Sequence, residues 1–176
     1  HVARTSLENY LAGKNNPRFE IENNELNQNL GAFVTLRKNG QLRGCLGEFE
    51  PGRPLWRVVR EKAIDAALHD PRFLPVTAEE LSDIKIEISV LSPRQKISGP
   101  NKIELGKHGV VIQKGSHSGV FLPQVATETG WDLETFLSQL CSQKAGLSRD
   151  CWKDKKVQLY TFTAQVFTEN SAEIKG

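Results

Sequence analysis

The sequence has no methionine, only three cysteines and no long apolar run. No apolar stretch approaches the roughly 18 residues that a membrane-spanning helix needs, and the N-terminus shows no basic region followed by an apolar core, as a secretion signal would. We therefore expect a cytoplasmic protein without a membrane partner. Because His1 is not an initiator residue, we also expect that the chain was trimmed.

The three cysteines, Cys45, Cys141 and Cys151, are widely spaced, and none belongs to a CxxC pair. An odd number of widely spaced cysteines does not indicate a disulfide framework, so we expect free thiols in a reducing compartment. Cys141 lies on the apolar side of a predicted helix and is interpreted as a core residue, whereas Cys151 has no assignable role.

The chain also lacks a Walker loop, a dinucleotide-binding fingerprint and an HExxH motif, so we predict no cofactor. His108 and His117 could join Cys45 as metal ligands, but nothing in their spacing demands it, and we predict no metal. The turn Gly106-Lys107-His108-Gly109 could instead bind an anion through its backbone amides. His108 is therefore a candidate ligand-binding residue, although such a turn is more often only the start of a hairpin.

Charge of one sign is not in excess, because 23 Lys and Arg stand against 21 Asp and Glu, for a net charge of +2. So small an imbalance does not indicate a nucleic-acid surface. The basic cluster Lys153, Lys155 and Lys156 is interpreted as a solvated loop. Nucleic acid is therefore an unlikely partner.

What is present predicts one domain over residues 1–176, since this length suffices for a sizeable core. Apolar residues recur with a helical period in segments 2–13, 54–69 and 133–141, the last behind Asp132 as the predicted N-cap. Predicted strands cover 32–37, 41–47, 84–91, 109–114, 120–122 and 157–167, and residues 93–100 are a predicted loop. Asn39-Gly40 predicts a hairpin turn between the first two strands. Helices thus alternate with hairpins, which favours an α+β domain with a largely antiparallel sheet.

The strand at residues 41–47 is the segment to which we assign the chemistry. Side chains alternate along a strand, so Arg43, Cys45 and Gly47 are expected on one face. A guanidinium beside a thiol favours the thiolate, and Gly44 and Gly47 leave space around the sulfur. Cys45 is therefore a candidate nucleophile, with Arg43 and both glycines as candidate ligand-binding residues. The alternative is an inert cysteine that serves as a small apolar residue.

Three other residues complete the candidate site. Asp70 and Arg72 lie in a rigid turn at a helix end and could face a ligand. Alternatively, Asp70 accepts hydrogen bonds from the turn and pairs with Arg72. Glu87 lies in the middle of a strand and could be a general base, although most strand carboxylates are solvated.

The hexapeptide Leu42-Arg43-Gly44-Cys45-Leu46-Gly47 resembles the signature of the AMMECR domain family. The resemblance extends in order through further segments over nearly the whole chain, which are Ala63-Ile64-Asp65-Ala66-Ala67, Asp70-Pro71-Arg72-Phe73, Ile88-Ser89-Val90-Leu91-Ser92-Pro93, Gly106-Lys107-His108-Gly109, Phe121-Leu122-Pro123-Gln124-Val125-Ala126 and Gly130-Trp131-Asp132. Leu46 and Leu74 depart from the residues usual in the family, which are isoleucine and proline.

The resemblance implies a two-lobed α+β fold with a smaller second lobe and with the hexapeptide near the groove between the lobes. It also implies an association with a Memo-like protein and a radical S-adenosylmethionine protein, as in AmmeMemoRadiSam systems. It implies no particular reaction.

We therefore predict a cleft-bearing domain that binds a small anionic ligand or a peptide. Such a domain could be an enzyme of a modification pathway, with Cys45 and Glu87 as catalytic residues. The alternative is a non-catalytic interaction module that docks on the Memo-like or the radical S-adenosylmethionine partner.

Overall fold

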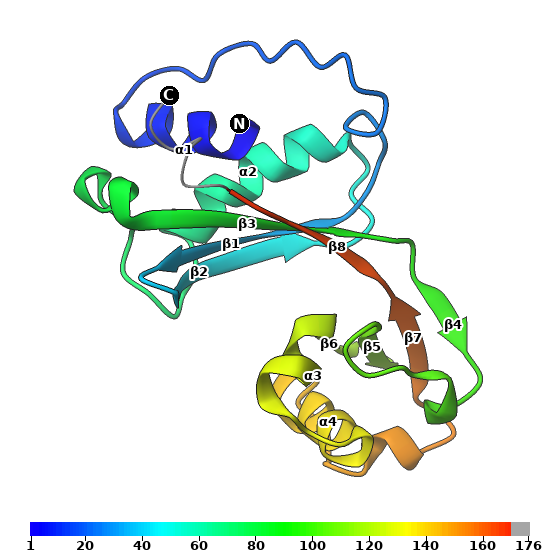
Figure 1. Ribbon diagram of the computed structural model, residues 1–176. Coiled ribbons are helices and arrows are strands. Elements are labelled where there is room, and N and C mark those ends of the chain that lie inside the picture. Colours follow the sequence, from blue (N-terminus) through cyan, green and yellow to red (C-terminus); the bar gives the residue numbers. More distant parts are fainter. Residues whose placement is uncertain (170–176) are drawn as a thin grey trace. The chain divides into compact units, whose positions relative to one another are not determined.

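The structure is a computed structural model that describes residues 1–169, and it divides into two compact units (Figure 1). Unit 1 contains His1–Leu91 and the segment that begins at Gln165, and unit 2 contains Ser92–Ala164. Each unit has its own four-stranded sheet and its own helical segments. The predicted two-lobed α+β fold is therefore confirmed.

Unit 1 is built on a sheet with the strand order β2-β1-β3-β8. Its strands are β1 (Ala32–Lys38), β2 (Gln41–Glu48), β3 (Ile84–Leu91) and β8 (Ala164–Thr168), and its helices are α1 (Val2–Leu11), α2 (Leu55–Leu68) and the 3-10 turn η1 (Ala78–Asp83). β1 pairs antiparallel with both β2 and β3. The first two strands form the predicted hairpin, with Lys38 opposite Gln41.

The core of unit 1 lies between one face of this sheet and α2 (Figure 1). Val34 and Leu36 of β1 are fully buried against that helix, whose own apolar side includes Val58 and Ala63. Side chains alternate along a strand, so Phe33, Thr35 and Arg37 project from the opposite face. The sheet therefore has one face that packs on α2 and an opposite face, on which Thr35 is also buried.

Unit 2 is built on a sheet with the order β4-β7-β5-β6. Its elements are β4 (Gln95–Ile97), η2 (Pro100–Lys102), β5 (Gly109–Lys114), β6 (His117–Phe121), α3 (Pro123–Thr129), α4 (Leu133–Gln139), the π-helical turn η3 (Leu140–Lys144), η4 (Cys151–Lys153) and β7 (Gln158–Phe162). Asp132 caps α4 as predicted, because its carboxylate accepts a hydrogen bond from the backbone N–H of Thr135 at 2.8 Å. Within residues 1–169, no helix has the length and hydropathy to cross a membrane.

Two local predictions were wrong, and one helix was missed. The predicted strand at 157–167 is two strands in different sheets, β7 and β8, because the chain breaks at Thr163, whose N–H and C=O both bond to Ser92. The predicted loop at 93–100 contains β4, which pairs with β7. The helix α3 was not predicted, although Pro123 at its first turn is a helix-start signal.

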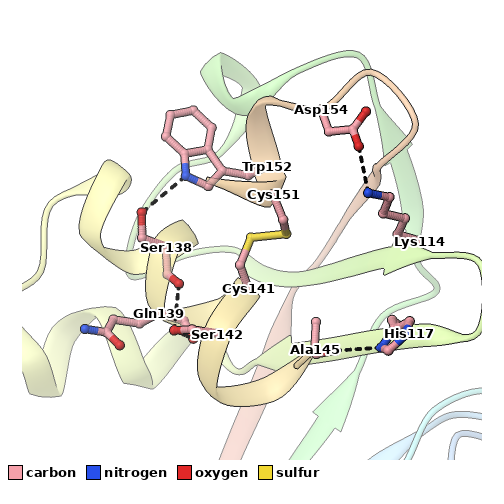
Figure 2. The surroundings of a disulfide bond; sticks show 10 residues. All are labelled: Lys114, His117, Ser138, Gln139, Cys141, Ser142, Ala145, Cys151, Trp152 and Asp154. Carbon is pink, nitrogen blue, oxygen red and sulfur yellow. Dashed lines mark hydrogen bonds and ion pairs between the residues drawn. A yellow bond between two sulfur atoms is a disulfide. The ribbon is translucent and has the colours of Figure 1, made fainter. Parts of the chain in front are cut away.

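The prediction of three free thiols was also wrong, because Cys141 and Cys151 form a disulfide in unit 2 (Figure 2). The chain reverses between η3 and η4 and brings the two Cα atoms to 6.0 Å, a separation that a disulfide spans. Both cysteines are buried, as predicted for Cys141. Closure of a loop of about 10 residues stabilises the folded state by about 2.7 kcal/mol in the chain-entropy model.

Candidate functional site

The hexapeptide lies on β2, which is an edge strand of the unit 1 sheet. The register between β1 and β2 shifts beside Leu36, because Leu36 faces Gly44 whereas Arg37 faces Leu42. Arg43 is the extra residue of this β-bulge. A bulge changes the alternation of side chains along a strand, so the face of each hexapeptide residue depends on which side of Arg43 it lies.

The prediction that Arg43 and Cys45 share a face was wrong for this reason. The guanidinium of Arg43 donates to both carboxylate oxygens of Glu80, at 3.2 and 3.0 Å. Lys38 binds the same carboxylate at 3.0 Å. In the alternation of β1, Lys38 lies on the face of the sheet that packs on α2. Arg43 therefore points away from the sulfur and does not stabilise a thiolate.

Gly44 lies against the last turns of α2. A Cβ atom at this position would lie 2.0 Å from the carbonyl oxygen of Ala66, well inside van der Waals contact. Only glycine allows helix and strand backbones to come so close. This approach places the end of α2, and Asp70 just after it, beside β2.

Asp70 and Arg72 bind the outer edge of β2 at Cys45. The Cys45 N–H donates to Oδ2 of Asp70 at 2.9 Å, and the Cys45 carbonyl accepts from Nη2 of Arg72 at 3.3 Å. Arg72 also pairs with Asp70, at 2.6 Å between Nη2 and Oδ2, and its N–H donates to Oδ1 at 3.1 Å. The predicted Asp70–Arg72 pair is confirmed, and these two side chains occupy the position of a neighbouring strand.

Arg43 binds the other end of the same turn. Its Nη1 donates to the carbonyl of Leu74 at 2.9 Å, and its Nη2 donates to the carbonyl of Pro75 at 3.4 Å. Residues 70–75 are thus attached to the hexapeptide at both ends, and we name them the clamped loop. Leu74 is 83% exposed, so the clamped loop presents a large apolar side chain to solvent.

Two carboxylates of this region are held in the charged form. Hydrogen bonds from Arg72 and from the backbone of Cys45 lower the pKa of Asp70 to about 2, against desolvation of this buried group. Hydrogen bonds from Arg43 and Lys38 lower the pKa of Glu80 to about 2. Both attachments of the clamped loop therefore keep their charges at neutral pH.

The sulfur of Cys45 is half-buried on the sheet face opposite α2, where Thr35 lies directly across from it. The Thr35 hydroxyl donates to Sγ at 3.2 Å. Burial raises the pKa of the Cys45 thiol, although the Thr35 hydrogen bond and the charge of Arg72 act in the opposite direction. Cys45 is therefore a neutral thiol at physiological pH.

We expect alkylation of Cys45 to be slow at pH 7 and to reach half its maximal rate above about pH 8.5, the ordinary thiol pKa. Thr35→Val should move this inflection higher still, because it removes a hydrogen bond that favours the thiolate. Cys45 is the only free cysteine, so iodoacetamide labelling of the oxidised protein measures it alone. An inflection below pH 8 would contradict the neutral thiol and support the hypothesis that Cys45 is a reactive thiolate.

The other predicted site residues are only partly brought together. Thr35 of β1 faces Cys45 on one neighbouring strand and Glu87 on the other. Two strand spacings, about 10 Å, therefore separate the backbones of Cys45 and Glu87. Glu87 pairs with Arg37 at 3.7 Å. A Cβ atom at Gly47 would lie 2.3 Å from the ring of Phe33, so the space that the glycine leaves is filled by this ring.

His108 belongs to unit 2 and accepts a hydrogen bond from the backbone N–H of Glu104 at 3.1 Å. It thereby closes the turn in which it lies. Within residues 1–169, no group of three His, Cys, Asp or Glu residues could hold a metal ion.

Unit 1 also contains a cavity of about 470 Å³ on the helix-covered face of its sheet. Its walls come from α1, residues 25–30, the start of α2, β3 and β8, with Trp56 and Phe167 as the aromatic members. None of the predicted site residues lines it. This apolar cavity is therefore separate from the clamped loop.

Sequence reasoning missed Glu80, Thr35 and Leu74. Thr77 and Glu80 form a capping box around η1, and the spacing T-x-x-E is a visible signal for it. Thr35 could not be placed, because counting back from Asn39-Gly40 without a bulge puts Gly44 opposite Thr35. The exposure of Leu74 had no signal, since apolar residues are normally expected to be buried.

Comparison with known proteins adds three findings. A family model described as AMMECR1 matches residues 1–167. The protein NEQ441 of Nanoarchaeum equitans is 43% identical over 96% of this chain and 97% of its own length, and a Methanothermobacter thermautotrophicus protein is 44% identical over 96% and 91%. A crystal structure of the protein PH0010 from Pyrococcus horikoshii matches with a TM-score of 0.89 at 42% identity, and it covers 96% of this chain and 88% of that one.

Proposed function

The chain belongs to the AMMECR1 family, and we propose that it is a binding module whose recognition element is the clamped loop. This proposal rests on one observation, which is what the polar groups of the hexapeptide bind. Arg43 and the backbone of Cys45 are both engaged in holding residues 70–75. The most distinctive segment of the chain thus serves to fix the shape of an exposed loop.

A fixed loop favours binding because less conformational entropy is lost when a partner docks. Arg72 contributes a half-exposed guanidinium whose orientation is set by Asp70. Leu74 contributes exposed apolar surface beside it. The loop therefore suits a partner surface, or a bound peptide, with an apolar pocket next to an acidic or carbonyl group.

Covalent catalysis by Cys45, with Glu87 as a base, is the second candidate. It is supported by the Thr35 hydroxyl and the Arg72 charge, both of which lower the pKa of Cys45. Burial outweighs both effects, and Glu87 is engaged by Arg37. The neutral thiol makes this candidate weaker than the binding module, and alkylation of Cys45 distinguishes them.

The family resemblance supplies the first partners to test, a Memo-like protein and a radical S-adenosylmethionine protein. Leu74→Asp should weaken binding to the true partner by about tenfold or more, because it puts a charge into an apolar contact. Arg43→Gln should also weaken it, because the loop loses one attachment. Surface plasmon resonance with immobilised partner measures both effects.

The matched control is Leu105→Asp, since Leu105 is 36% exposed and lies in unit 2. It should leave binding unchanged. A photo-crosslinker placed at position 74 and at position 105 provides a readout that does not depend on the choice of partner. Equal affinity of the Leu74→Asp and wild-type proteins, or identical crosslinked products from the two positions, would refute the proposal.

A further inference from the structure

Unit 2 contains a cavity of about 730 Å³ between the turn that follows β4 and the segment that leads from η4 into β7. This volume lies within the range of small-molecule sites in proteins. All its lining residues fall between Lys96 and Leu159. The cavity therefore belongs to unit 2, whereas the clamped loop belongs to unit 1.

The cavity concentrates positive charge in a chain that is otherwise nearly neutral. Its lining includes Lys96, Lys153, Lys155 and Lys156, and its one acidic residue is Asp154. Within residues 1–169, no ion pair within 4 Å engages Lys96, Lys155 or Lys156. Lys153 is 3.5 Å from the exposed Glu134 and lies over the Trp152 ring at 4.8 Å. The sequence interpretation grouped Lys153, Lys155 and Lys156 as a solvated loop. It did not include Lys96, which β4 contributes.

Asp154 forms its ion pair with a lysine outside the cavity, although its charge also interacts with that of Lys156. Its Oδ2 is 2.8 Å from the ammonium of Lys114, which does not line the cavity (Figure 2). Its Oδ1 accepts from the N–H of Lys156 at 2.9 Å, and its carbonyl accepts from the N–H of Val157. The aspartate thus fixes the turn that carries two lysines, while its own charge is already paired.

One part of the cavity wall is apolar. Ile97, Trp152 and Val157 line it and also pack on the unit 2 core. The indole N–H of Trp152 donates to the hydroxyl of Ser138 at 3.3 Å, next to the disulfide (Figure 2). The ring is therefore fixed, and its one polar atom is already satisfied.

We propose that this cavity binds a small organic polyphosphate of the nucleotide class. Lysine ammonium groups bind phosphate oxygens through charge-assisted hydrogen bonds. Three lysines outside any ion pair match a ligand with several negative charges better than they match a ligand with a single carboxylate. The apolar wall then contacts the base or another apolar group of the same ligand.

The test uses the intact protein with three probes, namely ATP, inorganic triphosphate and adenosine. We expect ATP to bind and to change the tryptophan fluorescence, triphosphate to bind more weakly, and adenosine not to bind measurably. The variant with Lys96→Gln, Lys155→Gln and Lys156→Gln should bind ATP at least about tenfold more weakly by calorimetry. These lysines are exposed, so the variant should remain folded, which circular dichroism checks.

The matched control replaces the exposed lysines Lys14, Lys85 and Lys107 by glutamine, which removes the same charge elsewhere. Its ATP affinity should stay within about twofold of wild type. Unchanged ATP binding in the cavity variant, or equal weakening in the control, would overturn the proposal. So would a clear preference for a single-stranded oligonucleotide over ATP, which would make the cavity part of a nucleic-acid surface.

Discussion

Replacing Gly44 by alanine should destabilise unit 1 by about 3 kcal/mol or more, a large fraction of the stability of a typical domain. The new Cβ atom would lie 2.0 Å from the carbonyl oxygen of Ala66. The oxygen belongs to the backbone of α2, and the position of the Cβ atom is fixed by the backbone of β2, so neither can move away as the end of a flexible side chain would. The helix end must therefore shift away from β2.

This shift should also release the clamped loop, because Asp70 follows α2 directly and bonds to the backbone of Cys45. Urea denaturation measures the loss of stability, and limited proteolysis within residues 70–75 measures the release of the loop. Gly52→Ala is the matched control, since nothing lies within 4 Å of its Cβ position and its φ is not positive. A Gly44→Ala protein as stable as Gly52→Ala would show that helix and strand do not pack this closely.

Replacing Asp70 by alanine should cost about 3 kcal/mol, because three groups lose their acceptor at once. These groups are the Cys45 N–H, the Arg72 N–H and the Arg72 guanidinium. Asp70 is only 4% exposed, so water does not readily replace it. Asp83→Asn removes an exposed carboxylate and should change stability by less than about 0.5 kcal/mol.

The pH dependence gives Asp70 a distinct signature. Its folded-state pKa of about 2 lies below the ordinary value of 3.8, so ionised Asp70 stabilises the fold by about 2 kcal/mol above pH 3.8. That contribution is lost as the pH falls from 3.8 through about 2. The stability difference between wild type and Asp70→Asn should therefore shrink over this range, as urea titrations at successive pH values would show. A difference independent of pH would mean that the pKa of Asp70 is the same in the folded and the unfolded protein, so that its hydrogen bonds do not favour the ionised form.

Much of the architecture was predictable because its signals are local. Alternating apolar residues located β3, and the Asn39-Gly40 pair located the hairpin. Asp132 marked the start of α4. Each of these depends on backbone preferences and side-chain periods that a short segment carries by itself.

The disulfide was not predictable from spacing. Cys141 and Cys151 are 10 positions apart, and that distance along the chain does not reveal whether the Cα atoms approach within bonding range. The approach depends on how η3 packs on β6 and α4 and how η4 packs on α4. The same holds for the lysine-lined cavity, to which β4 adds Lys96 from far along the sequence.

The sequence by itself determined that the hexapeptide is a strand, and it offered the Asp70–Arg72 pair as one of two alternatives. Only the tertiary structure decided the role of Arg43. One extra residue in β2 moves its side chain to the other side of the sheet, and the alternation of a strand cannot reveal a bulge that pairing with β1 creates. The arginine therefore holds a loop instead of activating a thiol.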